Sequence, residues 1–329
     1  MKLKEGSIKK TIRWLGVAAP VFEIVFLPLT ILSGIWLRIV RYWSLKRMPI
    51  TKKFFLKLGF FPIVDHYYDP LFDYRKARTV SYKDHLNFND TFQLGFLGSL
   101  RFCKELNEIP IRIKSNEEFY HENGSFGGGD AELYYSIIRK NKPQTIIEIG
   151  SGYSTLLALK AIEKNKLEPP YSCELICVEP YEMSYLESKP IKLIRKKVED
   201  LPLDLFSTLK ANDILFIDSS HIIRPGGDVT HIILSVLPAL PKGVWIHFHD
   251  IFIPQDYPTA WLKNDFRMWN EQYLLMAFLL GNSGFEIVSA LNYLRLGYLD
   301  EVILALPSVA EKPDVRPGSF WIRKSYGTS

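Results

Sequence analysis

Residues 145–155 read T-I-I-E-I-G-S-G-Y-S-T, and this stretch decides which fold the chain is expected to adopt. Its apolar first half has the length of a short buried strand. Gly150 and Gly152 follow directly, and glycine lets the backbone turn tightly and approach a ligand. A helix is expected to begin after the turn, with unpaired N–H groups near Ser154 and Thr155. The stretch therefore predicts a strand, a glycine turn and a helix in succession.

The same alternation of strands and helices continues along the rest of the chain. Helices are expected over 131–139, 227–240 and 270–280. Apolar runs of strand length occur in the segments ELICVEP, IKLIRKKVEDL, NDILFIDSSH, VWIHFHDIF, FEIVSALN and SFWIRK (174–180, 191–201, 212–221, 244–252, 285–292 and 319–324). Strands that alternate with helices at this spacing form mostly parallel sheets with right-handed crossovers. The expected fold is therefore α/β, and the order of the last two strands is left open.

Polar residues gather where four of the predicted strands end. Glu179 ends the second strand, Glu199 and Asp200 follow the third, Asp218 ends the fourth and Asp250 ends the fifth. Open α/β sheets bind their ligands at the carboxyl ends of the strands, so these residues are expected to line one ligand site.

The glycine turn differs from the fingerprint of a dinucleotide-binding protein. That fingerprint has a third glycine three positions after Gly152, where this chain has Thr155. A pyrophosphate ligand is therefore disfavoured, and what remains is an acid shortly before Gly150 and another at the end of the second strand. We expect Glu179 to accept hydrogen bonds from both hydroxyls of a ribose, and Glu148 to lie near a cationic amino-acid group.

In these features the chain resembles the class I S-adenosylmethionine-dependent methyltransferases, over roughly residues 126–324. The resemblance rests on E-I-G-S-G-Y-S-T, C-V-E-P, V-E-D, D-I-L-F-I-D-S-S-H and H-F-H-D, which occur in the order of the family's motifs. It implies a Rossmann-like, mostly parallel sheet and S-adenosylmethionine as the cofactor. By this resemblance, the methionine part of the cofactor would contact Glu148, Gly150, Gly152 and Ser154, the ribose Glu179, and the adenine Val198, Glu199 and Asp200.

Acids and histidines gather after the fourth and fifth strands. Asp218 and His221 follow the fourth strand, and His249 and Asp250 follow the fifth, so the two aspartates are expected to face one another. Two carboxylates with a nearby histidine and water suit Mg²⁺ best, with Ca²⁺ and Mn²⁺ as alternatives, and zinc is disfavoured. Such an ion would bind an acceptor hydroxyl, lower its pKa and orient its oxygen toward the methyl group.

This arrangement resembles the metal-dependent O-methyltransferases, both catechol-type and sugar-type. The resemblance implies that Asp218 and Asp250 are metal ligands and that His221 stands at the position of the catalytic base. The chain departs from the pattern at His249, where these enzymes often have a second acid, and at Ile251, where catechol-type enzymes have an amide ligand. Both histidines are therefore candidates for the catalytic base, and His249 is also a candidate metal ligand.

Other residues near these strands have weaker links to the chemistry. His247 is expected to be a core histidine, and His231 a helical residue without a catalytic role. The segment 252–275 contains aromatic and polar residues that suit a polyhydroxylated acceptor: Trp261, Trp269, Asn270, Glu271, Gln272 and Tyr273. An acceptor role and a packing role both stay open for these residues.

The net charge of +5 is unevenly distributed along the 329 residues. Residues 1–47 contain nine basic and two acidic residues, which gives +7, and the rest of the chain carries −2. Nucleic acid is therefore disfavoured as a partner of the body of the protein. Three cysteines, Cys103, Cys173 and Cys177, are too few for a disulfide framework and suit a reducing compartment.

The basic end also contains the most apolar stretch, residues 14–37, with a single charge at Glu23. As one helix it would be about 36 Å long, enough to cross a hydrocarbon layer of about 30 Å. Pro20 and Pro28 interrupt the pattern, so a re-entrant or interfacial helix fits as well as a single span. A helical hairpin packed on the body is the third alternative. Basic residues on both flanks favour the cytoplasmic face of an anionic membrane.

Three segments are expected: a basic apolar membrane-associating segment at 1–50, an extension or cap at 51–125, and the methyltransferase domain at 126–329. The expected function is methylation of a hydroxyl on a small molecule, sugar, glycan or lipid-linked acceptor. Two alternatives stay open: a membrane-tethered protein of this fold without catalysis, and a metal-independent methyltransferase with a histidine base. A homo-oligomer is also left open.

Overall fold

The computed structural model describes residues 19–63, 81–113, 117–181, 183–265, 267–311 and 316–325. The chain divides into two compact units, Met1–Ala77 and Arg78–Ser329, each of which is described by itself below. Residues 1–18, which include five of the nine basic residues of the N-terminal segment, lie outside the described residues. The segment boundaries expected at residues 50 and 125 stay predictions.

The second unit contains a seven-stranded sheet in the order β3-β2-β1-β4-β5-β7-β6. The strands are β1 Thr145–Ile149, β2 Glu174–Val178, β3 Lys192–Ile194, β4 Ile214–Ile217, β5 Trp245–Phe248, β6 Phe285–Ala290 and β7 Phe320–Lys324. Strands β1 to β5 are parallel, and β7 lies antiparallel between β5 and β6. The expected α/β fold with a mostly parallel sheet is therefore confirmed, and the structure adds the order of the last two strands.

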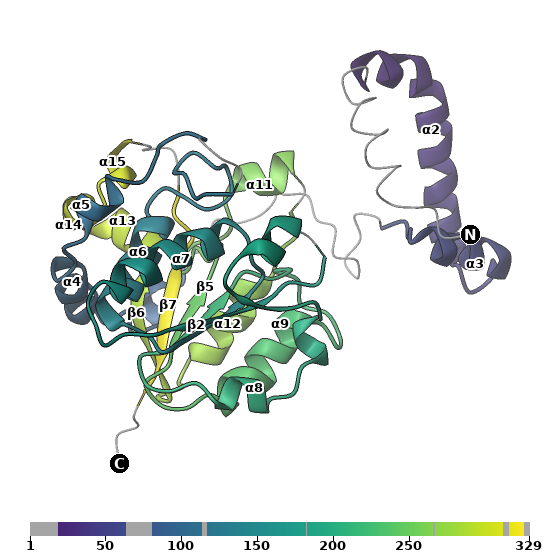
Figure 1. The fold of residues 1–329 in the computed structure, drawn as a ribbon. Coiled ribbons are helices and arrows are strands. Elements are labelled where there is room, and N and C mark those ends of the chain that lie inside the picture. Colours follow the sequence, from purple (N-terminus) through teal and green to yellow (C-terminus); the bar gives the residue numbers. More distant parts are fainter. Residues whose placement is uncertain are drawn as a thin grey trace. The chain divides into compact units, whose positions relative to one another are not determined.

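Helices cover both faces of this sheet (Figure 1). The main ones are α4 Asp90–Gly98, α6 Asp130–Asn141, α7 Tyr153–Lys166, α9 Asp228–His231, α12 Glu271–Leu279, α13 Leu291–Gly297 and α14 Leu299–Ala305. Shorter ones are α5 Cys103–Leu106, α8 Asp204–Ser207, α10 Leu237–Ala239, α11 Thr259–Asn264 and α15 Ser308–Glu311. The crossover from β1 to β2 runs toward one edge of the sheet, and the crossover from β4 to β5 runs toward the other edge. Because both crossovers are right-handed, α7 and α9 lie on opposite faces of the sheet.

The register of the parallel strands sets the position of the residues that follow them. Ile149 at the end of β1 pairs with Val178 of β2 and with Ile217 of β4, and Ile217 pairs with Phe248 of β5. Four strands therefore end at one level of the sheet. These strands are almost continuously apolar because both of their faces are covered.

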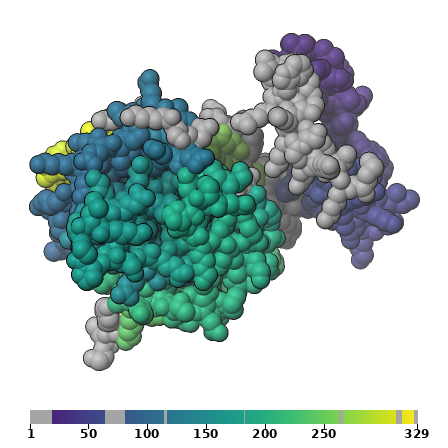
Figure 2. Space-filling view, in the orientation of Figure 1, coloured from purple at the N-terminus to yellow at the C-terminus, as the bar shows by residue number. Residues whose placement is uncertain are grey.

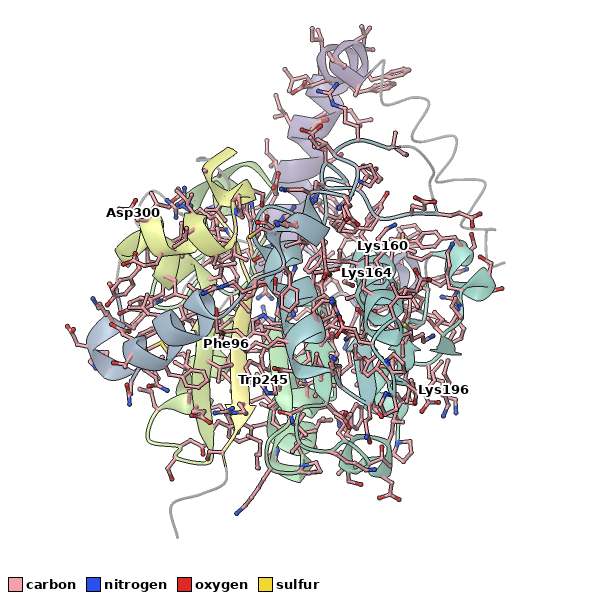
Figure 3. The ribbon with its side chains drawn as sticks, turned by 60° about the vertical axis from the view of Figure 1, so that its left-hand side comes forward. Phe96, Lys160, Lys164, Lys196, Trp245 and Asp300 are labelled. Carbon is pink, nitrogen blue, oxygen red and sulfur yellow. The ribbon has the colours of Figure 1, made fainter. Side chains whose placement is uncertain are left out.

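The described segment that begins at residue 81 packs on the same core as the sheet. Phe96 of α4 lies against Trp245 at the start of β5, with 5.2 Å between the ring centroids, and Figure 3 shows the two rings together. The Tyr293 hydroxyl donates to the Asp90 carboxylate of α4 at 2.9 Å. Residues 81–113 thus belong structurally to the second unit.

The first unit is described by two helices, α2 Ala19–Trp43 and α3 Pro49–Leu58. Helix α2 is continuous through Pro28, and the Thr30 hydroxyl donates to the Phe26 carbonyl at 3.0 Å. Val40 is the only residue of α2 that is buried, and it packs with Leu45 and Phe55. Figure 2 shows α2 in purple, with side chains along its surface. At about 1.5 Å per residue the helix is about 37 Å long, so its length and composition allow it to cross a membrane.

Candidate active site

The glycine turn after β1 brings the end of this strand directly against the end of β4. Gly150 has a φ of +78°, a conformation that side chains other than glycine rarely adopt. A Cβ atom at this position would lie 1.8 Å from the Asp218 carbonyl oxygen. The Gly150 N–H also donates to the Val178 carbonyl at 3.0 Å. Glycine is therefore required here for the ends of β1, β2 and β4 to meet.

A cleft of about 280 Å³ opens where these strands end. Its lining includes Gly150, Glu179, Val198, Glu199 and Asp218. The Glu179 carboxylate is fixed by two backbone N–H groups, those of Ser151 at 3.4 Å and Tyr181 at 2.9 Å. A carboxylate oriented at the end of β2 can accept hydrogen bonds from neighbouring hydroxyls of a bound molecule. The cleft therefore presents an oriented carboxylate at the position of the predicted ribose site, whose role stays a prediction.

The remaining predicted cofactor residues lie beside the cleft rather than among its lining residues. Gly152 and Ser154 are at the start of α7, where the Gly152 N–H donates to the Thr155 hydroxyl at 3.0 Å. Asp200 ends the short helical turn Val198–Asp200 that follows β3. Their roles in cofactor binding stay predictions.

Glu148 is fully buried beneath the glycine turn. Its carboxylate accepts hydrogen bonds from the hydroxyls of Tyr134 and Thr155, and the Cys177 thiol lies 3.7 Å away. Burial raises the pKa of Glu148 to about 7, although these three donors act in the opposite direction. Glu148 thus links α6, β1, α7 and β2, and its predicted contact with the methionine part of the cofactor stays a prediction.

The structure brings the predicted acids and histidines into one cluster next to the cleft. One ligand atom each of Asp218, His221 and Asp250 lies within 4.8 Å of the others. The His221 Nε2 is 3.3 Å from Asp218 Oδ1 and 3.9 Å from Asp250 Oδ2. His221 and Asp250 have φ values of +58° and +57°. Such left-handed conformations in residues other than glycine cost about 1–3 kcal/mol and cluster at functional sites.

His249 is buried on another side of the two aspartates. Its Nδ1 lies 3.5 Å from Asp218 Oδ2 and 3.7 Å from Asp250 Oδ2, and its Nε2 lies 3.6 Å from Asp130 Oδ2. Asp130 begins α6 and accepts hydrogen bonds from the backbone N–H groups of Gly318 and Ser319, at 3.0 and 2.8 Å. The segment before β7 therefore fixes the carboxylate that faces the far nitrogen of His249.

His221 is held by the start of α12. Its Nδ1 lies 2.8 Å from Glu271 Oε2, and its carbonyl oxygen accepts from the N–H groups of Asn270 and Glu271. The Trp269 ring covers the imidazole, with 4.2 Å between centroids. The Arg267 guanidinium lies over both Trp269 and Trp261. Glu271, for which an acceptor role and a packing role were both left open, is buried in contact with His221.

The cluster is electrostatically unusual. Burial would lower the pKa of His221, but its hydrogen bonds to Asp218 and Glu271 raise this pKa to about 10. Burial likewise opposes the charge on His249, whose pKa is nevertheless raised well above its ordinary value by Asp250 and Asp218. The pKa of Asp218 is lowered despite its burial, because His249 and His221 face it, whereas burial raises the pKa of Asp250.

The cluster has more acids than bases. It contains the carboxyl groups of Asp130, Asp218, Asp250 and Glu271 and two imidazoles, so it carries a formal charge of −2 when all six groups are ionised. The pKa shifts above belong to the cluster before any cation offsets the carboxylates. An excess of negative charge in a partly buried site favours binding of a cation.

His247 is a core histidine, as the sequence predicted. It is fully buried, its Nε2 lies 3.0 Å from the Ser319 hydroxyl, and its ring stacks on Phe216. Burial lowers the pKa of His247 well below its ordinary value, so the ring is neutral. His231 lies on α9.

Sequence reasoning missed Asp130, although a signal was present. Asp130 follows three consecutive glycines at 127–129 and begins a predicted helix, a place where an acid is often retained as a cap. Gly129 has a φ of +94°, and a Cβ atom there would lie 2.7 Å from the Val309 side chain, so this turn requires glycine. The glycine run allows the close approach that carries Asp130 to His249.

Comparison with known proteins assigns the domain. Residues 147–251 match a family model described as a methyltransferase domain. An uncharacterised protein of Archaeoglobus fulgidus is 30% identical over 166 residues, which cover 45% of this chain and 74% of that protein.

Two solved structures have lower similarity, each at 12% identity. The O-methyltransferase TomG of Streptomyces achromogenes, in complex with SAM, has a TM-score of 0.36 over 75% of this chain and 100% of TomG. An O-methyltransferase of Bacillus cereus with bound SAH has a TM-score of 0.30 over 59% of this chain and 81% of that chain. At these TM-scores, neither structure bears on the activity of this chain.

The matched domain covers the strands whose ends form the cleft and the cluster, from β1 to the end of β5. The mostly parallel sheet agrees with the fold that the sequence motifs implied. The chain belongs to the class I S-adenosylmethionine-dependent methyltransferases.

Proposed function

We propose that this methyltransferase acts on a hydroxyl group of a small-molecule, sugar or lipid-linked acceptor, with a divalent cation, at the cytoplasmic face of a membrane. The observation that carries the proposal is the position of Asp218. This residue lines the cleft beside Glu179 and also contacts His221 and His249. The cofactor site and the groups that can activate a hydroxyl therefore share one residue.

In the proposed complex the cleft holds S-adenosylmethionine, which supplies a methyl group activated by its positive sulfur. Glu179 accepts the ribose hydroxyls, since its carboxylate is already oriented by two backbone N–H groups. Val198 and Glu199 border the adenine, and Gly150 allows the close approach of the backbone. These residues position the donor, and their contribution is one of binding and orientation.

Asp218, Asp250 and His249 fit the proposed cation. The nitrogen His249 Nδ1 is buried without a hydrogen-bond partner in the described structure and faces both aspartates. A cation there supplies charge that lowers the pKa of an acceptor hydroxyl. His221 Nε2, which faces the same aspartates, is the proposed acceptor of the hydroxyl proton, with His249 as the second candidate.

The proposed membrane location rests on α2 and α3. The apolar side chains of α2 are exposed in the described part of the chain, and α3 carries the exposed lysines Lys52, Lys53 and Lys57. An apolar helix beside a basic amphipathic helix is typical of segments that bind anionic membranes. A lipid-linked acceptor would be available to a protein held there.

The test measures cofactor binding and methyl transfer separately. Calorimetry on the full-length protein is expected to show binding of S-adenosylmethionine, weakened about 10-fold or more in Glu179→Gln, because the ribose hydroxyls lose a charged acceptor. Methyl transfer from labelled cofactor into lipid and glycan extracts is expected to disappear in Asp218→Asn. Exposed Glu174→Gln at the start of β2 is the matched control for both measurements.

Absence of cofactor binding by the parent protein would contradict the proposal at its first step. Binding without transfer into any hydroxyl-bearing extract would favour the non-catalytic alternative. Transfer that is unchanged by a chelator would favour the metal-independent enzyme with a histidine base.

A further inference from the structure

Two imidazole nitrogens face the Asp218–Asp250 pair from different elements. His221 Nε2 comes from the loop after β4, and His249 Nδ1 from the end of β5. Each lies between 3.3 and 3.9 Å from oxygens of both aspartates. Ligands bound to one ion at about 2.1 Å lie about 3.0–3.4 Å from each other in octahedral or tetrahedral sites. The ligand atoms of Asp218, His221 and Asp250 lie within 4.8 Å of one another, and His249 Nδ1 faces the same two aspartates from another side.

Each imidazole is backed by a buried carboxylate on its far nitrogen. Glu271 lies 2.8 Å from His221 Nδ1, and Asp130 lies 3.6 Å from His249 Nε2. Both acids are more than nine-tenths buried. A carboxylate that holds the N–H on one side of an imidazole leaves the lone pair of the other nitrogen free, and metal-bound histidines almost always have such a partner. The contact is a hydrogen bond at His221 and a longer ion-pair contact at His249.

An ordinary salt-bridge cluster does not explain His249 fully. Its residue is 6% exposed, yet Nδ1 makes no hydrogen bond in the described structure and faces two aspartates. Its contacts with the two aspartates, at 3.5 and 3.7 Å, are ion-pair contacts and not hydrogen bonds. Coordination of an ion by Nδ1 would replace these long contacts.

The donor set decides which ions are preferred. Carboxylates alone suit Mg²⁺ and Ca²⁺, whereas imidazole is a better ligand for divalent transition ions. The affinity of a mixed nitrogen and oxygen site rises from Mn²⁺ through Co²⁺. Two imidazoles in one site therefore change the expected ion from Mg²⁺ to a divalent transition ion.

We propose that Asp218, Asp250, His221 and His249 form a two-aspartate, two-histidine site that prefers Mn²⁺ and Co²⁺ to Mg²⁺ and Ca²⁺, with Asp130 and Glu271 as the positioning residues of the two histidines. The inference rests on the proposed function, which includes a cation at this site. It adds the identity of the ligands and of the preferred ions. His221 Nε2 cannot bind the ion and accept the substrate proton at the same time. If His221 is the proton acceptor, its Nε2 must therefore leave the ion before the proton is transferred.

The first experiment uses the full-length protein and Mn²⁺ as the probe. Electron spin-echo modulation of the bound Mn²⁺ is expected to show coupling to ¹⁴N, reduced in His221→Gln and in His249→Gln and absent in the double variant. Exposed His85→Gln, on the turn Lys83–His85, is the matched control and is expected to leave the coupling unchanged. Circular dichroism of each variant verifies that it is folded.

The second experiment measures affinity by calorimetry. Mn²⁺ and Co²⁺ are each expected to bind at least about 10-fold more tightly than Mg²⁺ or Ca²⁺, and Asp130→Asn to weaken Mn²⁺ binding about 10-fold while the ¹⁴N coupling of His221 remains. Bound Mn²⁺ without ¹⁴N coupling, or equal affinities for Mn²⁺ and Mg²⁺, would overturn the inference. Failure to bind any of the four ions would overturn it too.

The two proposals fail in different ways. Nitrogen-coupled Mn²⁺ in a protein that does not bind S-adenosylmethionine would leave the inference standing and contradict the proposed function. Methyl transfer supported by Mg²⁺, in a protein whose bound Mn²⁺ shows no nitrogen coupling, would support the proposed function and contradict the inference.

Discussion

Helix α2 exposes apolar residues, whereas helix α6 buries charged residues. α2 has one charge between residues 19 and 37, yet Val40 is its only buried residue. α6 carries Asp130, Glu132 and Arg139, and all ten of its first residues are buried. Each of these charges has partners: backbone N–H groups, a serine hydroxyl, and the carboxylates of two glutamates. Burial of the charges of α6 therefore follows from available partners, whereas within its own unit the described residues bury only Val40 of α2.

The largest expected effect comes from charging α2. Each of Leu27→Asp and Ile31→Asp should weaken membrane insertion by about 3 kcal/mol, because an aspartate in the middle of a membrane helix costs about 2.5–3.5 kcal/mol. Together they should reduce partition into vesicles by about 10,000-fold. Flotation of the full-length protein with phospholipid vesicles measures this loss.

The control places the same charge on an exposed leucine of the second unit. Leu304→Asp, on α14, is expected to float like the parent, since Leu304 is already 81% exposed. A double α2 variant that floats as well as the parent would remove the argument for a membrane helix.

A smaller effect is expected from the buried acid Glu148. Its pKa of about 7 in the folded protein lies above the ordinary value of 4.5, so the folded state keeps a proton that the unfolded state has lost. The free energy of unfolding should therefore fall as the pH rises from about 4.5 to 7 and then level off, by about 3 kcal/mol in total. Glu148→Gln lacks this titration.

The measurement compares urea unfolding of Glu148→Gln and the parent at several pH values. The difference in unfolding free energy, variant minus parent, should rise by about 3 kcal/mol between pH 4.5 and 7. Glu163→Gln, an exposed change on α7, should show no such rise. A difference for Glu148→Gln that does not depend on pH would show that its carboxyl group is ionised throughout.

The sequence predicted the part of the site that depends on strand ends. Asp218 directly follows β4 and Asp250 lies two residues after the end of β5, and one ligand atom of each lies within 4.8 Å of the other. Asp130 was missed because its contact with His249 spans more than a hundred residues and depends on the turn at 127–129. Periodicity reports which face of an element is covered, but it does not report which distant side chain covers it.

Burial of polar residues was the second limit. The sequence assigned Glu148 to the cofactor through the family resemblance and left both an acceptor role and a packing role open for Glu271. The structure buries both, with Glu148 among three donors and Glu271 in contact with His221. The continuity of α2 through Pro28 was left open for a related reason, since a proline disrupts a helix by an amount that its surroundings decide.

The smallest expected effect concerns the lysines of α3, and it separates two forms of membrane attachment. Lys53 and Lys57 are exposed on the same short helix as Phe54 and Leu58, which are also exposed. Near an anionic surface each lysine contributes about 1 kcal/mol, so Lys53→Gln with Lys57→Gln should weaken binding to phosphatidylserine vesicles about 30-fold. Binding to neutral vesicles should not change, and the difference should shrink at high salt.

If α2 alone holds the protein in the bilayer, the α3 variant will float like the parent on both kinds of vesicle, because a spanning helix does not depend on surface charge. If α3 also lies on the surface, only the anionic vesicles will detect the change. Lys196→Gln is the matched control, an exposed lysine of the second unit that is labelled in Figure 3. Equal losses on neutral and anionic vesicles would instead mean that the two substitutions disturb the packing of Phe55 against Val40 and Leu45, and not the attraction to lipid headgroups.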